Sequence, residues 1–170
     1  MFCQCNQIDE LQIENMPEIL PLEIKGNSLE TCLENFFSPE NIDRTCPQYS
    51  SKEAMQVTII VRNPKIFPIQ LKRFEYVQQL QRSIKKHDSI LIPDRFQLPC
   101  GTEYSLLSIV NHQGETPNSG HYTCHLFESR QSFTEVDDLK IRKAVQQSEN
   151  ITKTAYLLVA SLPKLGQLHL

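Results

Sequence analysis

Apolar and polar residues alternate over several short stretches of the chain, which is the pattern of half-buried β-strands. Leu20, Leu22 and Ile24 alternate with Pro21 and Glu23 and predict the first of these strands. Alternating or continuous apolar runs predict further strands at 57–61, 67–71, 104–110, 122–127 and 155–160. Asn63-Pro64 ends the first of these runs, because a residue before proline is driven away from regular structure.

One segment has a helical period instead. Asn27 is placed to cap a helix with Glu30 at its third position. A single apolar stripe then follows at helical spacing, formed by Leu29, Cys32, Leu33, Phe36 and Phe37. We expect this helix to face the core, and we expect a second helix at about 139–148. The polar segment 77–88 is predicted to be an exposed loop or a short polar helix.

These elements predict an α+β fold dominated by antiparallel strands. The chain has 170 residues, of which 39% are apolar and 22% charged, enough for one ordered domain and too apolar for a disordered chain. We place that domain at 1–162 and expect 163–170 to be a tail. Lys85 and Lys86 are expected to be a solvated pair, and Lys72 and Arg73 to be surface or structural charges.

The charge balance limits the partners. Lys and Arg number 17 and Asp and Glu number 20, a formal charge of −3, so nucleic acid is not the expected partner. No apolar run of about 18 residues predicts a membrane span. The start of the sequence lacks the basic and apolar regions of a secretory signal. We therefore expect an intracellular, cytoplasmic or nuclear protein whose six cysteines are reduced.

A histidine and an aspartate form the candidate chemical site. Gly120 leaves His121 open on one side, and Asp137 follows sixteen residues later. A short hairpin would let Asp137 accept a proton from one imidazole nitrogen and leave the other nitrogen to act as a base. Spacing alone favours a purely structural His–Asp pair over a catalytic one. His125 faces the same way as His121, but about 13 Å along the strand, too far to share one proton.

Four motifs carry a resemblance to a known family. They are Leu71-Lys72-Arg73-Phe74, Ser119-Gly120-His121-Tyr122-Thr123, Val136-Asp137-Asp138 and Ala155-Tyr156-Leu157-Leu158. In this order they resemble the ubiquitin-specific proteases, papain-like cysteine peptidases that remove ubiquitin. The resemblance runs from about residue 3 to residue 160. It implies the palm and part of the fingers of that catalytic domain, with the N-terminal thumb missing from this chain.

The resemblance also implies roles. His121 matches the general base, Asp137 the residue that orients it, and Asp138 an assisting acidic position. His112, Gly120 and Tyr122 are expected to line the site. The implied reaction is attack of a thiol on the carbonyl of the C-terminal glycine of ubiquitin, and the implied partners are ubiquitin and ubiquitinated proteins.

Two family features are not matched. The family's nucleophile lies in a Gly-x-x-Asn-x-Gly-Asn-x-Cys segment, and none of the six cysteines here follows Gly-Asn. We therefore expect the chain alone to be inactive, either as part of a thiol protease, as a pseudoenzyme that binds ubiquitin or a partner, or as a remnant. The zinc positions of the family hold Cys3, Cys5, Cys46 and a tyrosine, a poor tetrahedral set, so we expect neither structural zinc nor another cofactor.

Overall fold

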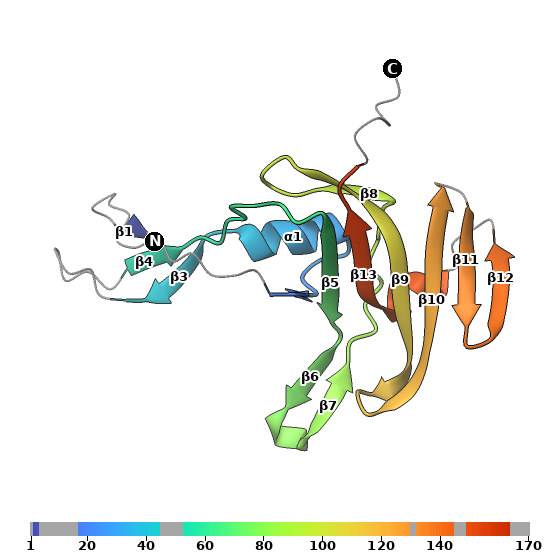
Figure 1. The fold of residues 1–170 in the computed structure, drawn as a ribbon. Helices are drawn as coiled ribbons and strands as arrows, with labels where there is room; N and C mark the ends of the chain where they lie inside the picture. The colour runs from blue at the N-terminus through green and yellow to red at the C-terminus, as the bar shows by residue number, and fades with distance from the viewer. Residues whose placement is uncertain (1, 4–16, 45–52, 130–131, 145–148, 164–170) are drawn as a thin grey trace.

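The computed structural model describes residues 2–3, 17–44, 53–129, 132–144 and 149–163, and its largest element is an eight-stranded sheet (Figure 1). The strands of this sheet are β2 (Leu20–Glu23), β5 (Ile66–Lys72), β8 (Arg95–Gln97), β9 (Glu103–Thr116), β10 (Ser119–Ser129), β11 (Ser132–Asp137), β12 (Lys140–Ala144) and β13 (Ala155–Ser161). Their order is β12-β11-β10-β9-β13-β5-β2, with β8 paired to β9. All neighbouring strands are antiparallel except β2 and β5.

Two smaller sheets flank the large one. The strands β1 (Phe2–Cys3), β3 (Glu40–Asp43) and β4 (Glu53–Gln56) pair in the order β1-β4-β3 at the end of the molecule opposite β12 (Figure 1). The strands β6 (Phe74–Val77) and β7 (Arg82–Lys85) form a hairpin around the short 3₁₀ turn η1 (Gln78–Leu80). This hairpin continues from β5 and lies beside the end of β9 that leads into β10 (Figure 1).

The predicted helix is present as α1 (Leu29–Phe37), but its cap is Ser28 and not Asn27. The Ser28 hydroxyl accepts a hydrogen bond from the backbone N–H of Thr31 at 3.1 Å. Asn27 is unavailable because its carbonyl accepts the Leu91 N–H at 2.8 Å, which ties the chain before the helix to an extended segment. A backbone contact remote in sequence therefore shifts the start of the helix by one residue.

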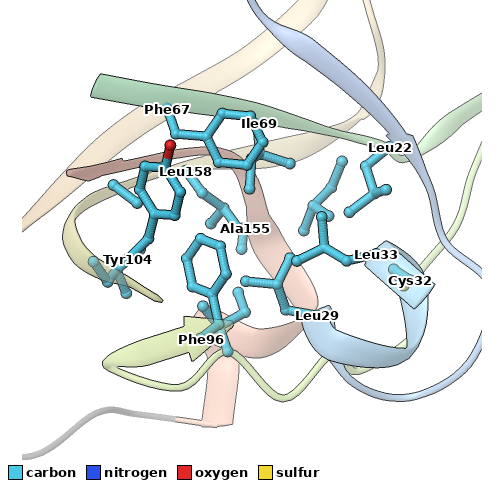
Figure 2. Close-up of a cluster of buried hydrophobic side chains, with 14 of the residues drawn as sticks. Leu22, Leu29, Cys32, Leu33, Phe67, Ile69, Phe96, Tyr104, Ala155 and Leu158 are labelled. Carbon is cyan, nitrogen blue, oxygen red and sulfur yellow. The ribbon is translucent and has the colours of Figure 1, made fainter. Parts of the chain in front are cut away.

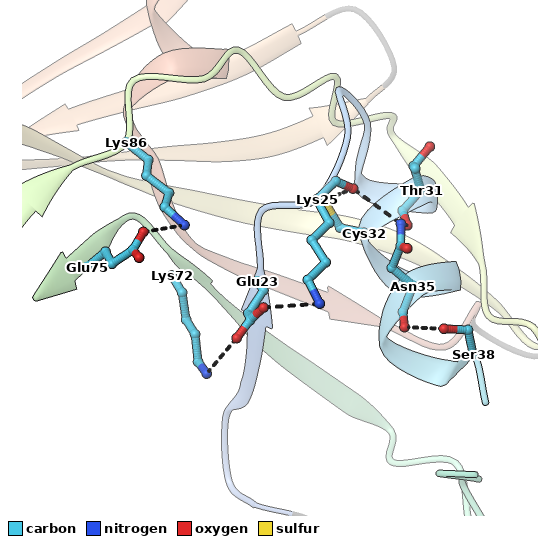
Figure 3. A network of polar contacts seen from close by, with 9 residues as sticks. All are labelled: Glu23, Lys25, Thr31, Cys32, Asn35, Ser38, Lys72, Glu75 and Lys86. Carbon is cyan, nitrogen blue, oxygen red and sulfur yellow. Dashed lines mark hydrogen bonds and ion pairs between the residues drawn. The ribbon is translucent and has the colours of Figure 1, made fainter. Parts of the chain in front are cut away.

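Polar contacts hold α1 in place (Figure 3). The Cys32 thiol and the Asn35 amide both donate to the Lys25 carbonyl, at 3.5 and 3.4 Å, and fix α1 against the loop that follows β2. At the C-terminal end of the helix the Ser38 hydroxyl donates to the Asn35 carbonyl at 2.7 Å. This last bond satisfies a backbone oxygen that helix geometry leaves unpaired.

The hydrophobic core lies between α1 and one face of the large sheet (Figure 2). Leu29, Cys32 and Leu33 are fully buried there, so the predicted core-facing stripe is confirmed. Phe67 and Tyr104 pack ring against ring, with centroids 5.0 Å apart. A second short helix, α2 (Glu149–Thr154), leads directly into β13. Within the described residues, neither helix is long and apolar enough to cross a membrane.

The strand predictions have mixed outcomes. Those at 20–24, 67–71, 104–110, 122–127 and 155–160 are confirmed by β2, β5, β9, β10 and β13. The prediction at 57–61 is wrong, because the strand in that region is β4 and ends at Gln56. Ile59 and Val61 are 62% and 70% exposed, and this segment pairs with no strand among the described residues. Its alternation of apolar residues therefore does not mark a buried face.

Two further predictions are corrected. Residues 140–144, expected in a helix, form the edge strand β12, which folds back on β11 through the two-residue turn at Asp138 and Leu139; residues 145–148 lie outside the described residues. The polar segment 77–88 contributes most of the β6–β7 hairpin. Lys85 is not solvated but only 6% exposed, whereas Lys86 is partly exposed and pairs with Glu75 at 2.9 Å.

Arg73 is a structural charge, completely buried at the junction of β5 and β6. Its guanidinium donates to four carbonyl oxygens, those of Ala155 (2.5 Å), Lys86 (3.0 Å), Asp88 (3.0 Å) and Thr152 (2.8 Å). One side chain thus joins β5, β13, α2 and the segment after β7. Burial lowers the pKa of Arg73 to about 10, and the Asp88 carboxylate partly opposes this shift.

Candidate active site

The strands β10 and β11 bring His121 and Asp137 together. Cys124 lies opposite Val136, and continuing this register puts Thr123 opposite Asp137 and His121 diagonal to it on the same face. His121 Nε2 and Asp137 Oδ1 are 2.5 Å apart. The contact expected from the sixteen-residue spacing is therefore present, and it uses Nε2.

The electrostatics of this pair favour an ionised carboxylate. The hydrogen bond from His121 holds the pKa of Asp137 below its usual range, and the cations of Lys140 and Arg142 act in the same direction. Because Asp137 takes up Nε2, Nδ1 is the nitrogen left to accept a proton, and it has no partner among the described residues. The His121 and Asp137 side chains are 46% and 33% exposed, so the pair is open to another group.

Asp138 is the first residue of the turn between β11 and β12, with a left-handed φ of 51°. One carboxylate oxygen of Asp138, one of Asp137 and one nitrogen of His121 all lie within 4.8 Å of one another. In the described part of the chain this is the one group of three or more His, Cys, Asp or Glu side chains close enough to share a metal ion. Within this group the His121 imidazole and the Asp137 carboxylate are hydrogen-bonded to each other.

The β9–β10 hairpin sets the backbone just before His121. Gly120 has a φ of 156°, and a Cβ there would collide with His112 Nε2 and lie 2.5 Å from the Gln113 carbonyl. The ladder shifts register between Ser119 and His121. Gly120 is therefore required by the close packing of the two strands, and it sets the direction in which His121 leaves the turn.

His112 and Tyr122 pair across the same hairpin, which by strand alternation puts them on the face away from His121. His112 is 1% exposed, and its ring packs 4.7 Å from that of Tyr122 and 5.4 Å from that of Phe74. Burial lowers the pKa of His112, and the Lys85 ammonium adds to this shift. His112 thus supports the hairpin from behind, while Tyr122 is half exposed.

Two polar contacts next to the site were not predicted. Asn111 Nδ2 and His125 Nδ1 are 2.7 Å apart in the interior, and Asn111 Oδ1 accepts from Thr154. Burial lowers the pKa of His125, against the opposing effect of Glu135. The second contact is made by the Lys85 ammonium, which donates to backbone carbonyls of the β9–β10 hairpin. Lys85 lies in a polar stretch of sequence, and nothing in that stretch indicates that this lysine is buried.

Most of the expected zinc positions cannot be placed. Cys5 and Cys46 lie outside the described residues, and of Cys3 only the backbone, in β1, is described. The expectation that no structural zinc is bound therefore stays a prediction. Among the described residues Cys32, Cys100 and Cys124 are free thiols.

Comparison with known proteins identifies the family. The model of the ubiquitin carboxyl-terminal hydrolase family matches residues 2–159. The chain belongs to this family. The resemblance expected from the four motifs is thereby confirmed over nearly the whole length of the sequence.

Relatives of this chain include ubiquitin carboxyl-terminal hydrolase 4 of Arabidopsis thaliana, which is 35% identical over 70% of this chain and 36% of its own length. Probable ubiquitin carboxyl-terminal hydrolase 8 of Schizosaccharomyces pombe is 31% identical over 82% of this chain and 31% of its own. The chain therefore spans about a third of the length of each of these two relatives.

Solved structures agree with this assignment. A structure of the yeast SAGA DUB module superposes with a TM-score of 0.79 at 25% identity, covering 94% of this chain and 38% of that one. The SAGA Ubp8/Sgf11/Sus1/Sgf73 module bound to ubiquitin aldehyde gives 0.73 at 25% identity, over 85% and 36%. The predicted fold class, part of a papain-like ubiquitin-specific protease domain built mostly of strands, is confirmed.

Proposed function

We propose that this chain supplies the general base of a cysteine-type deubiquitinase. The observation that carries the proposal is the 2.5 Å contact between His121 Nε2 and Asp137, which leaves Nδ1 free on an exposed imidazole. Nδ1 takes the proton of a cysteine thiol, the thiolate attacks the carbonyl of the C-terminal glycine of ubiquitin, and the imidazolium returns the proton to the departing amine. Water then hydrolyses the thioester and releases ubiquitin.

The two aspartates act on the imidazole and not on the substrate. Asp137 accepts a hydrogen bond from Nε2–H, which fixes the tautomer with Nδ1 as the base, and its negative charge stabilises the imidazolium once Nδ1 is protonated. Lys140 and Arg142 help to keep Asp137 ionised through their effect on its pKa. Asp138 adds a second carboxylate within 4.8 Å and strengthens the same stabilisation.

Ubiquitin is the proposed ligand. Support comes from the family and from the related SAGA DUB module, which has been solved with ubiquitin aldehyde and with monoubiquitin. The nucleophile is proposed to come from chain outside these 170 residues, because none of the six cysteines follows Gly-Asn. That same observation favours the second candidate, a pseudoenzyme that binds ubiquitin without cleaving it.

The test is turnover of a ubiquitin C-terminal fluorogenic amide by the longest natural protein that contains this sequence. We expect His121→Gln and Asp137→Asn each to lower kcat by roughly 10³–10⁴. Lys86→Met, a change at a partly exposed residue outside the site, should leave kcat unchanged. Turnover that survives His121→Gln contradicts the proposal. Binding of ubiquitin without any turnover by the wild-type protein assigns the pseudoenzyme instead.

A further inference from the structure

Lys85 is a buried cation, and among the described residues no carboxylate is in hydrogen-bond contact with it. Its ammonium donates to the carbonyls of His112 and Gly114, each at 2.7 Å, and lies 3.4 Å from His112 Nδ1. Burial lowers the pKa of Lys85, against the opposing charge of Glu115, and Arg73 lowers it further. Burying an ammonium costs free energy that its hydrogen bonds must offset.

The neighbouring lysine shows the ordinary alternative. Lys86 leaves the same strand end with its side chain 37% exposed and forms an ion pair with Glu75 at 2.9 Å (Figure 3). Lys86 therefore keeps its charge in contact with both solvent and a carboxylate. Lys85 has neither advantage, and its burial is explained by the two carbonyls that its ammonium contacts.

The two carbonyls bracket the strand partner of His121. Gln113 lies directly opposite His121 in the β9–β10 ladder, and the ammonium binds the residue on either side of it. The ladder is irregular at this point, because its register shifts between Ser119 and His121. Paired strands alone therefore fix the backbone here less firmly than in a regular ladder.

Gly114 and Gly120 allow the two backbone segments of the β9–β10 hairpin to pack in direct contact. A Cβ on Gly114 would lie 2.5 Å from the Ser119 carbonyl and 2.8 Å from the Gly120 Cα atom. The backbone segments on the two sides of the hairpin thus touch directly where Lys85 binds. A small shift of the 112–114 segment must move Gly120, and with it His121.

We propose that Lys85 is a positioning residue for His121. Its ammonium holds the 112–114 segment from the β6–β7 hairpin, and this fixes the backbone from which the imidazole reaches Asp137. Lys85 touches no reacting atom in this scheme. The inference deepens the proposed function, on which it rests, since it takes His121 as the base.

The test measures the His121–Asp137 contact itself by NMR in the chain as given. The hydrogen bond from His121 lowers the pKa of Asp137, so the titration of the Asp137 carboxyl carbon reports whether the contact is made. We expect Lys85→Met to raise the Asp137 pKa by at least half of the rise that His121→Gln causes. The nitrogen shifts of His121 should show loss of the Nε2–H tautomer in the same variant. Lys86→Met is the matched control and should change neither signal.

A folded Lys85→Met variant with the wild-type Asp137 titration and His121 tautomer overturns the proposal and leaves Lys85 a stabilising residue only. If Lys85→Met does not fold, Lys85→Arg decides. Arginine keeps a charge and N–H donors but is longer and planar, so the two carbonyls must move. An unchanged Asp137 titration in folded Lys85→Arg also overturns the proposal. Because no readout is turnover, failure here is distinct from failure of the proposed function.

Discussion

Replacing Arg73 by methionine removes every side-chain N–H donor of a fully buried residue while keeping a side chain of similar length. The Ala155 carbonyl then loses a fully buried hydrogen bond. The other three bonds are partly buried, and the Thr152 carbonyl keeps its bond from the Ile90 N–H at 3.1 Å. The cost is therefore concentrated at one oxygen.

The magnitude follows from these contacts. Leaving a buried acceptor unpaired costs about 1–3 kcal/mol, and a hydrogen bond to a charged group contributes about 1.5–3 kcal/mol net. Water can replace much of the three partly buried bonds, and the variant no longer buries a cation, whose cost the lowered pKa of about 10 records. We therefore expect Arg73→Met to lower the free energy of unfolding by about 2–4 kcal/mol, a large share of the roughly 5–15 kcal/mol typical of a domain.

The assay is urea unfolding followed by far-ultraviolet circular dichroism, since the chain has no tryptophan. Lys72→Met is the matched control: Lys72 precedes Arg73, is 48% exposed and contacts Glu23 only at 3.9 Å, so its loss should stay within about 0.5 kcal/mol. Arg73→Lys keeps the charge but supplies fewer donors, so its loss of unfolding free energy should lie between those of Lys72→Met and Arg73→Met. A loss below about 1 kcal/mol for Arg73→Met would refute the view that this side chain joins the strands around it.

Three further outcomes are expected. Gly120→Ala should lower the free energy of unfolding, measured with urea, by about 2 kcal/mol or more, because the new Cβ meets His112 and the φ of 156° disfavours an L-residue. An unchanged free energy of unfolding would mean that the hairpin can open there without penalty. Burial lowers the pKa of His125, so the unfolded chain binds protons more readily and stability should fall as pH drops below about 6.5. His125→Gln should lessen the loss measured between pH 7 and pH 5, and an identical loss would assign it to other groups. Hydrogen bonds from the Thr102 side chain and backbone lower the pKa of the exposed Cys100 thiol, whereas burial raises the pKa of the Cys32 thiol. Iodoacetamide should therefore label Cys100 before Cys32, and equal labelling of the two in peptide mass spectra would contradict this order.

The contact between His121 and Asp137 could be predicted because it is made by a local hairpin. Sixteen residues separate them, the consecutive strands β10 and β11 pair antiparallel, and strand alternation then decides which side chains share a face. The stripe of α1 was equally readable, because helical spacing alone determines which residues face the core. Local periodicity is enough where an element and its partner are neighbours in sequence.

Features that depend on distant contacts could not be predicted in this way. The apolar alternation at 57–61 looks like a strand, yet it lacks a partner among the described residues and stays exposed. Residues 140–144 have no strand pattern but pair along β11, whose edge offers hydrogen bonds whatever the side chains are. Lys85 is indistinguishable from Lys86 in the sequence, and only the packing of β7 on the β9–β10 hairpin separates them.

The atom by which His121 contacts Asp137 constrains whatever completes the site. In the proposed function, Nε2 is taken, so the thiol comes within hydrogen-bond distance, roughly 3–3.5 Å, of Nδ1. The described thiols are placed otherwise: Cys32 donates to the Lys25 carbonyl beneath α1, and Cys100 contacts Thr102. Cys124 lies on β10 an odd number of residues from His121, which puts it on the other face of the sheet. The proposed function therefore requires a thiol carried by chain outside the described residues, which approaches the face of β10 and β11 that bears Asp137.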